Sequence, residues 1–285
     1  MAIIIDGKTV SATVKQSVAE ECQRMYAQTG KRPGLAVIIV GDDPASRVYV
    51  NNKKKACEFV GFVSREYALP ETTTQYELSQ LIDKLNNDTA VNGILCQLPL
   101  PKHLDEKAVI EKIAVEKDVD AFHCANVGKI MIGDFDFLPC TPSGIMEMLD
   151  YYNIEISGKE CVVLGRSNIV GKPMAMLLLH KNGTVTICHS KTQNLKEVCQ
   201  RADILVVAVG KPRFVSADMV KNGAVVIDVG INRTADGKLC GDVDFETVEK
   251  KASYITPVPG GVGPMTIATL MKNTLTAFKV QNHLL

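Results

Sequence analysis

The stretch CVVLGRSNIVGKPMAMLLLH, residues 161–180, decides how the second half of this chain is expected to fold. Apolar residues at 161–164 are typical of a buried strand, a glycine turn follows at 165–173, and 174–180 has the composition of a helix. Glycines let backbone approach a ligand, and the free amides of a helix N-terminus favour phosphate. Ser167 replaces the second glycine of the usual Gly-x-Gly-x-x-Gly motif, so the motif alone fits a turn without ligand equally well.

Runs of apolar, β-branched residues alternate with helix-like segments along the whole chain. Residues 46–60 and 76–87, for example, carry apolar side chains at helical spacing. Alternation of this kind predicts an α/β fold with largely parallel strands. The expected strands are 35–40, 93–96, 161–164, 184–188, 204–207 and 224–229.

Two breaks in this periodicity suggest two domains. Residues 133–143, with Pro139 and Pro142, interrupt the pattern, and we place the domain change there, giving domains 1–140 and 141–264. The second break, 256–264, holds three prolines and three glycines and precedes an amphipathic helix in 265–285. We expect that helix to complete the first domain.

Composition excludes several classes of protein. The 285 residues are 46% hydrophobic, and 32 basic and 32 acidic residues give a formal net charge of +0. Such a balance predicts neither nucleic acid nor a membrane surface as partner. No apolar run is long enough for a membrane span, and Asp6 and Lys8 interrupt any signal peptide, so we expect a cytoplasmic protein.

Nine cysteines, an odd number without Cys-x-x-Cys spacing, are expected to be reduced and mostly buried. The five histidines show no spacing typical of metal ligands, so no metal is expected.

The strand after the glycine turn favours NADP over NAD. Its end reads Cys188-His189-Ser190-Lys191 and lacks the carboxylate that would accept the ribose 2′-hydroxyl of NAD. Ser190, Lys191 and Arg166 supply donors and positive charge for a 2′-phosphate, unless the two basic side chains are merely solvated. Gly230 and Ile231, after a later strand, either border the nicotinamide or form a plain turn.

Candidate substrate residues occur in the first half of the chain. Tyr49 and Lys53 are four residues apart, so they share one helix face, although an exposed lysine on a surface helix is the commoner case. Gln97 follows the strand at 93–96. Asp118 and Asp120 offer carboxylates to a ring N–H, or else cap backbone.

The ordered set of motifs resembles one family, the bifunctional methylenetetrahydrofolate dehydrogenase/methenyltetrahydrofolate cyclohydrolases. The resemblance spans nearly the whole chain, and the set in order is highly specific. Its motifs are Gly41-Asp42-Asp43-Pro44-Ala45-Ser46 with Tyr49 and Lys53, Gln97-Leu98-Pro99-Leu100-Pro101, Lys117-Asp118-Val119-Asp120, Pro139-Cys140-Thr141-Pro142, the turn 165–173, His189-Ser190-Lys191-Thr192 and 256–264.

The resemblance implies roles for residues of this chain. Lys53 would be the catalytic lysine, Tyr49 the ring that stacks on folate, Gln97 the partner that orients the lysine, and Asp120 the pterin anchor. Pro259, Gly260 and Gly261 would border the folate. The residues implied for NADP are Gly165, Arg166, Ser167, Ser190 and Ile231, to which the sequence itself adds Lys191 and Gly230.

The family further implies an N-terminal α/β substrate domain and a Rossmann-like NADP-binding domain with a cleft between them, and a homodimer. Its members act on tetrahydrofolate derivatives in one-carbon metabolism, which feeds purine synthesis. Two positions depart from the pattern: Ala121 stands where glycine is usual and Cys124 where proline is common. Ala121 would strain the Asp120 turn if that position needs a positive φ.

Lys53 must be partly neutral to act as a base, so its pKa is expected to be lowered by desolvation and by neighbouring positive charge. Two other functions remain open. Another two-domain NADP dehydrogenase, resembling shikimate dehydrogenase, would bind a carboxylate and give no shift of folate absorbance. A nucleotide-binding protein without catalysis would show no turnover.

Overall fold

The computed structural model describes residues 1–234 and 237–284, and these form two compact units. One, here called the six-stranded unit, comprises residues 1–11 and 141–266. The other, called the three-stranded unit, comprises residues 12–140 and 267–285. The helices α1 (Gly7–Thr29), α6 (Cys140–Tyr151) and α10 (Val262–Gln281) contribute residues to both units.

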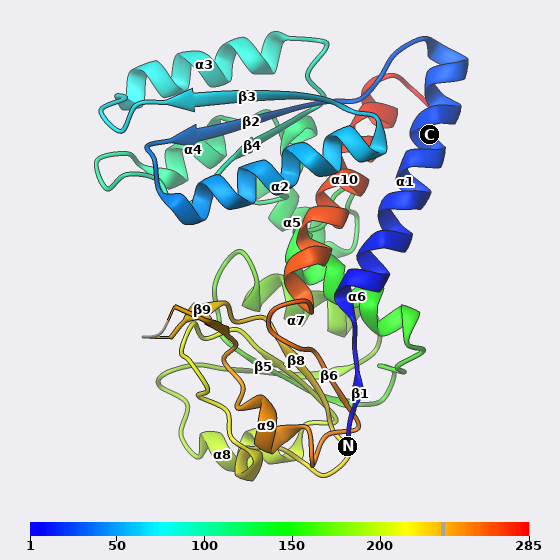
Figure 1. The fold of residues 1–285 in the computed structure, drawn as a ribbon, viewed down its shortest axis with the longest axis vertical. Helices are drawn as coiled ribbons and strands as arrows, with labels where there is room; N and C mark the ends of the chain where they lie inside the picture. The colour runs from blue at the N-terminus through cyan, green and yellow to red at the C-terminus, as the bar shows by residue number, and fades with distance from the viewer. Residues whose placement is uncertain (235–236, 285) are drawn as a thin grey trace. The chain divides into compact units, whose positions relative to one another are not determined.

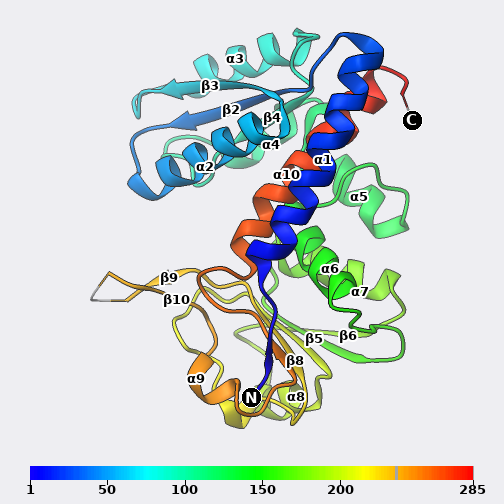
Figure 2. The same cartoon turned by 45° about the vertical axis from the view of Figure 1, so that its right-hand side comes forward.

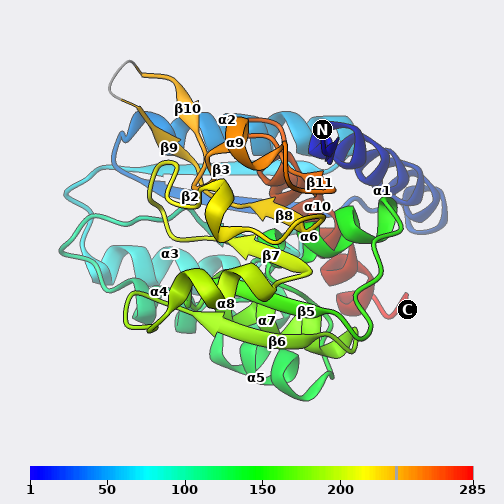
Figure 3. The ribbon, with the colours of Figure 1, turned by 90° about the horizontal axis from the view of Figure 1, so that it is seen from below.

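All strands of the six-stranded sheet are parallel, in the order β1-β11-β8-β7-β5-β6, and Figure 3 shows most of them side by side. Their bounds are Ile3–Ile4 (β1), Tyr254–Ile255 (β11), Val225–Asp228 (β8), Ile204–Val207 (β7), Glu160–Leu164 (β5) and Thr184–Cys188 (β6). Counted from β5, the order is 2-1-3-4-5, a doubly wound arrangement. Its direction of winding reverses between β5 and β7, where such sheets bind ligands at their carboxyl ends.

Helices cover both faces of this sheet (Figure 2). On one face α7 (Gly171–His180) contacts β5 and β6. On the other, α8 (Leu195–Arg201) and α9 (Phe245–Val248) pack on Leu164, Leu205 and Val226. A short 3₁₀ helix, η2 (Ala217–Met219), and the antiparallel pair β9 (Asn232–Arg233) and β10 (Leu239–Cys240) complete the described part.

The three-stranded sheet is parallel, with β2 (Gly34–Val40) between β3 (Val63–Leu69) and β4 (Gly93–Cys96). Every residue of β2 is buried, and alternate side chains enter two cores. The core under α2 (Pro44–Val60) also takes α1 and α10, whereas the opposite one takes α3 (Gln75–Asn87) and α4 (Glu106–Lys112). Figure 1 shows α2 and α3 on opposite faces of the sheet. The 3₁₀ helix η1 (Val115–Lys117) and α5 (Cys124–Ile132) follow.

The α/β fold with parallel strands is confirmed, and all six predicted strands occur, with ends shifted by at most one residue. The prediction missed α1, a helix of 23 residues, because its apolar face is narrow and interrupted by polar residues. It also assigned residues 1–11 to the first domain. They belong to the six-stranded unit, because Ile3 and Ile4 pair with Tyr254 and Ile255.

All nine cysteines are free thiols, and seven of them are buried, as the composition predicted. Among the described helices, none combines the length and the apolar character that crossing a membrane requires.

Candidate functional site

The helix α2 places Lys53 in the interior of the three-stranded unit. The helix begins at Pro44, and the Asp43 carboxylate accepts a hydrogen bond from the Ser46 N–H at 2.8 Å. Lys53 lies near the middle of the helix and is only 8% exposed. One turn earlier, Tyr49 is 36% exposed. The common expectation for such a lysine, a solvated amine on a surface helix, is therefore wrong here.

The Lys53 amine has a fixed partner in Gln97, the first residue after β4. Lys53 Nζ donates to Gln97 Oε1 at 2.7 Å. The other end of the amide, Gln97 Nε2, donates to the Leu98 carbonyl oxygen at 2.7 Å. This second bond fixes which amide atom faces the lysine, so Gln97 presents an acceptor to the amine.

Burial dominates the electrostatics around Lys53. It lowers the pKa of the Lys53 amine, and the negative charge of Asp120 opposes that effect. Burial likewise raises the pKa of Asp120, while Lys53 and a hydrogen bond from the Cys140 thiol act in the opposite direction. The structure thus brings Lys53, Gln97 and Asp120 together. The Lys53 pKa is lowered by burial as expected, but the neighbouring charge is the negative one of Asp120 and not the expected positive one.

The turn that carries Asp120 is held by residues that sequence reasoning did not identify. Asn273, buried on α10, donates through Nδ2 to the carbonyl oxygens of Val119 and Leu138, both at 2.8 Å. Asp118 accepts hydrogen bonds from the His123 N–H and from Asn126 Nδ2, each at 2.8 Å. Asp118 is therefore a structural residue, and its sequence position could not distinguish it from Asp120.

Position 121 does adopt a positive φ, and Ala121 occupies it with φ 56°. Its methyl group is completely buried in the core beside α2 and α10.

The residues predicted for the cofactor all follow strands of the six-stranded sheet. Gly165 to Ser167 follow β5, Ser190 and Lys191 follow β6, and Gly230 and Ile231 follow β8. Because these strands are parallel, the residues gather at the carboxyl edge of one sheet. Pro259, Gly260 and Gly261 follow β11 at this edge, and so belong to a different unit from Lys53, Gln97 and Asp120.

Two glycines make the turn after β5 narrow. A Cβ on Gly165, where φ is +133°, would lie 2.2 Å from the Ala208 carbonyl oxygen at the end of β7. A Cβ on Gly171 would lie 2.3 Å from the carbonyl oxygen of Gly165. Ser167 Oγ accepts from the N–H groups of Val170 and Gly171 at 3.2 Å, and thereby holds the turn that leads into α7. A side chain at position 165 or 171 would fill the space inside this turn. With glycine at both positions, the turn fits the phosphates of a dinucleotide.

Two buried carboxylates shape the next loops of the same edge, and sequence reasoning missed both. Asp242 is fully buried and accepts from the consecutive N–H groups of Val209, Gly210 and Lys211 at 2.6, 2.8 and 2.9 Å. Asp228, at the end of β8, accepts from the N–H groups of Gly230, Asp242 and Val243 at 2.9–3.0 Å. No periodicity or motif distinguishes these aspartates from surface ones.

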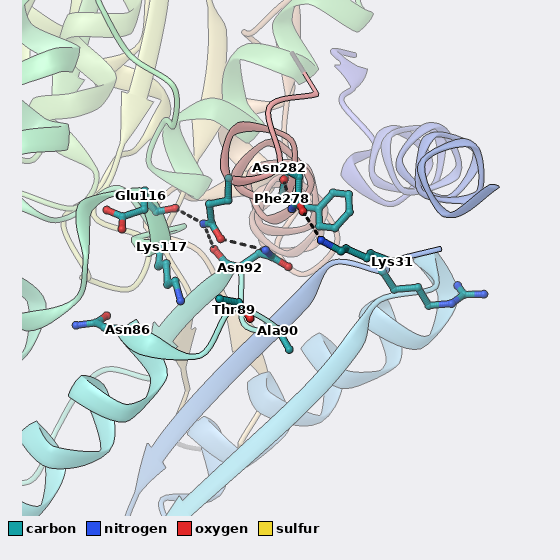
Figure 4. A pocket seen from close by; sticks show the side chains of 11 residues that line it. Lys31, Asn86, Thr89, Ala90, Asn92, Glu116, Lys117, Phe278 and Asn282 are labelled. Carbon is teal, nitrogen blue, oxygen red and sulfur yellow. Dashed lines mark hydrogen bonds between the residues drawn. The ribbon is translucent and has the colours of Figure 1, made fainter. Parts of the chain in front are cut away.

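A separate pocket of about 610 Å³ lies in the three-stranded unit (Figure 4). Its polar groups bond to one another: Lys31 Nζ donates to Asn282 Oδ1 at 3.2 Å, and Gln281 Nε2 donates to the carbonyl oxygens of Asn92 and Glu116 at 2.8 Å. None of the described residues that line it was predicted to bind substrate or cofactor.

Comparison with known proteins also divides the chain into two parts, although their bounds differ from those of the two units. Residues 5–120 match the family model of the tetrahydrofolate dehydrogenase/cyclohydrolase catalytic domain, and residues 139–282 match that of its NAD(P)-binding domain. A curated relative, the bifunctional protein FolD of Acetivibrio thermocellus, is 64% identical over 280 residues, which is 98% of each chain.

Two solved structures are similar over almost their full length. The bifunctional enzyme FolD, methylenetetrahydrofolate dehydrogenase/cyclohydrolase, from Campylobacter jejuni has a TM-score of 0.96 and 50% identity, covering 98% of this chain and 99% of that one. The Trypanosoma brucei methylenetetrahydrofolate dehydrogenase-cyclohydrolase, solved with NADP and an inhibitor, has a TM-score of 0.94 and 42% identity, covering 98% of each chain.

Gly165→Ala should weaken dinucleotide binding at least about tenfold, because the new methyl group would collide with the Ala208 carbonyl. The matched control is Gly158→Ala. Gly158 also has a positive φ, +74°, but nothing lies within 4 Å of the added atom, so only backbone strain of about 1–2 kcal/mol is expected. Fluorescence titration with NADP measures both variants, and equal affinity in the two would contradict the steric argument.

Asp228 should make stability depend on pH. Burial raises its pKa from 3.8 to about 6, so between pH 6 and 4 the folded chain holds a proton that the unfolded chain does not. Stability therefore rises as the pH falls through this window, by about 2 kcal/mol between pH 7 and 4.5 relative to Asp228→Asn. Denaturant unfolding of both proteins at several pH values measures this, and parallel curves would refute it.

Proposed function

The chain belongs to the tetrahydrofolate dehydrogenase/cyclohydrolase family, and we propose that it oxidises methylenetetrahydrofolate with NADP and hydrolyses the methenyl product to 10-formyltetrahydrofolate. The observation that carries this proposal is the buried Lys53 amine, 2.7 Å from Gln97 Oε1 and under the influence of Asp120. These three side chains are the ones that the family resemblance implies for the chemistry.

Hydrolysis of the methenyl cation requires proton transfer, and Lys53 supplies the group. Water adds to the cationic carbon and loses one proton, which a neutral amine accepts. The second water proton passes to the ring nitrogen as the bond between that nitrogen and the carbon breaks, which leaves the formyl group. Burial lowers the pKa of Lys53 and so increases the neutral fraction. Gln97 holds Nζ by accepting one of its hydrogens, and this orients the amine without supplying a charge.

The oxidation depends mainly on orientation, because the carbon that loses hydride is next to nitrogen and the resulting cation is resonance-stabilised. Asp120 is proposed to hold the pterin through its N–H groups, and Tyr49 to stack on the folate. NADP, when bound, accepts the hydride. The chain fixes the turns that would hold it: Gly165 to Ser167 for the phosphates, Ser190 and Lys191 for the 2′-phosphate, and Gly230 and Ile231 beside the nicotinamide.

NADP is preferred over NAD on the chemistry of the β6 end. Ser190 and Lys191 after β6 and Arg166 after the neighbouring β5 are all exposed, and they offer a hydroxyl and two positive charges. Charged donors of this type bind phosphate strongly.

The other functions have less support. A dehydrogenase resembling shikimate dehydrogenase would not explain why both family models are those of tetrahydrofolate enzymes. A silent nucleotide-binding protein would not need an amine that is both buried and oriented.

We also infer that the protein is a cytoplasmic homodimer. The strand β6 is an edge strand of the described sheet, and Ile187 on it is 37% exposed. An edge of this type is favourable for pairing with a second copy. Sedimentation equilibrium of the purified protein tests the dimer.

The activity is tested by mixing the purified protein with methylenetetrahydrofolate and NADP, then with NAD, and following absorbance. NADPH formation with no accumulation of acid-revealed methenyl product supports both activities. Failure to reduce either cofactor would overturn the proposed function.

Lys53→Met should lower the rate of methenyltetrahydrofolate hydrolysis about 10²–10⁴-fold, because the general base is lost. It should leave NADP affinity unchanged. Lys55→Met is the matched control, since Lys55 is exposed on the same helix. Full cyclohydrolase activity in the Lys53 variant would remove Lys53 from the mechanism.

Lys191→Ala should weaken NADP binding about tenfold or more and leave NAD binding unchanged, because a charge-assisted bond to the 2′-phosphate is lost. Dissociation constants for the two cofactors measure the change. An equal loss for both would assign Lys191 to the shared part of the dinucleotide.

A further inference from the structure

Three side chains with metal-binding atoms meet on the three-stranded unit, apart from Lys53 and its partners. They are Glu111 near the end of α4, His123 at the N-cap of α5, and Cys124, the first residue of α5. One ligand atom from each lies within 4.8 Å of the other two. Cys124 is one of the two positions that depart from the family pattern.

We propose that Glu111, His123 and Cys124 form a binding site for a single zinc ion or a similar divalent transition metal. A thiolate, an imidazole and a carboxylate are the three ligand types that zinc takes in proteins. Sulfur and nitrogen donors do not suit calcium or magnesium, which bind oxygen ligands.

The spacing of the ligand atoms fits one ion. Glu111 Oε2 lies 3.0 Å from Cys124 Sγ and 3.5 Å from His123 Nε2. Bonds of about 2.0–2.3 Å at tetrahedral angles put neighbouring ligand atoms about 3.5 Å apart. The His123 and Cys124 ligand atoms lie within 4.8 Å of each other, so this third pair must approach by at most about 1.3 Å to reach a common centre. Cys124 and Glu111 are exposed, so an ion reaches the site from solvent.

Metal binding would displace the proton that Cys124 and Glu111 share in the metal-free protein. The Cys124 thiol donates to Glu111 Oε2, so the carboxylate that would bind the metal now binds the thiol hydrogen. On binding, the S–H bond breaks, the proton passes to solvent and the sulfur electron pair forms the bond to the metal. No oxidation state changes.

Metal binding by His123 would break one hydrogen bond that the ring now makes. Its Nδ1 accepts a hydrogen bond from the Ala125 N–H at 3.1 Å, so the Nε2 that faces Glu111 carries the hydrogen in the neutral ring. Ligation through Nε2 moves this hydrogen to Nδ1 and ends the bond that caps α5. Metal binding and the α5 cap thus compete for one ring.

Sequence spacing gave no sign of the cluster, since Glu111 and Cys124 are 13 residues apart and the histidine and cysteine are adjacent. The fold brings them together because Glu111, near the end of α4, contacts His123 and Cys124 at the start of α5. The His123 N–H also donates to Asp118, so a metal would brace the turn after Asp120.

The experiment titrates the full-length, metal-free protein with Co²⁺ alone and follows the absorbance of the thiolate–cobalt bond, then displaces it with Zn²⁺. One equivalent should bind. Calorimetry with Zn²⁺ in two buffers of different ionisation enthalpy should show one proton more released by the native protein than by Cys124→Ser.

The variants separate this cluster from adventitious binding. Cys124→Ser should lose the thiolate band, and Glu111→Gln and His123→Asn should bind at least about tenfold more weakly, asparagine being able to keep the α5 cap. Cys240→Ser, at the other cysteine that is not buried, is the matched control and should behave as the native protein. Absence of a thiolate band in the native protein, or its persistence in Cys124→Ser, would overturn the proposal.

Discussion

The loops at the carboxyl edge of the six-stranded sheet, where the predicted cofactor residues gather, depend on the hydrogen bonds that the Asp242 carboxylate accepts. A buried carboxylate is costly unless its lone pairs are satisfied, and Asp242 is satisfied by three consecutive backbone N–H groups and by Asn232 Nδ2 at 2.9 Å. Those N–H groups belong to the loop after β7, whereas the Asp242 N–H is held by Asp228 at the end of β8. One pair of aspartates therefore ties together the loops of two neighbouring strands. A Cβ on Gly230 would lie 2.3 Å from the Asp242 carboxylate, which is why glycine occupies that position.

In the three-stranded unit the buried ionisable group is an amine, that of Lys53, rather than a carboxylate. Burying an amine favours its neutral form, and a nearby carboxylate favours the charged one. Lys53 experiences both, with burial the larger effect, and Gln97 adds an acceptor that either form can use. A full ion pair at closer range would hold the amine charged, whereas a neutral amide positions it and leaves it able to exchange a proton. The geometry therefore favours proton transfer over simple electrostatic binding.

The sequence predicted the elements whose pattern is local. The buried strands and the strand–turn–helix at 161–180 are recognisable because apolar runs and glycines carry their own signal. The resemblance then pointed to Lys53, Gln97 and Asp120, which the structure brings together. What it missed depends on distant contacts. The short β1 pairs with a strand about 250 residues away, and Asn273 reaches Val119 across 154 positions. Asp228 and Asp242 are ordinary aspartates in composition, and only the fold buries them.

Distant contacts also explain why the turn after Asp120 tolerates Ala121 at a position with a positive φ. A left-handed conformation costs an L-residue about 1–2 kcal/mol, and burial of its methyl group returns about 0.8 kcal/mol. The remainder is small beside the hydrogen bonds that fix the turn on both sides, from Asn273 to the Val119 carbonyl and from the His123 N–H to Asp118. A turn determined this strongly keeps its shape whichever small residue stands at position 121. The position of Asp120 therefore depends on α10 and on Asp118, and the replacement of the usual glycine leaves it in place.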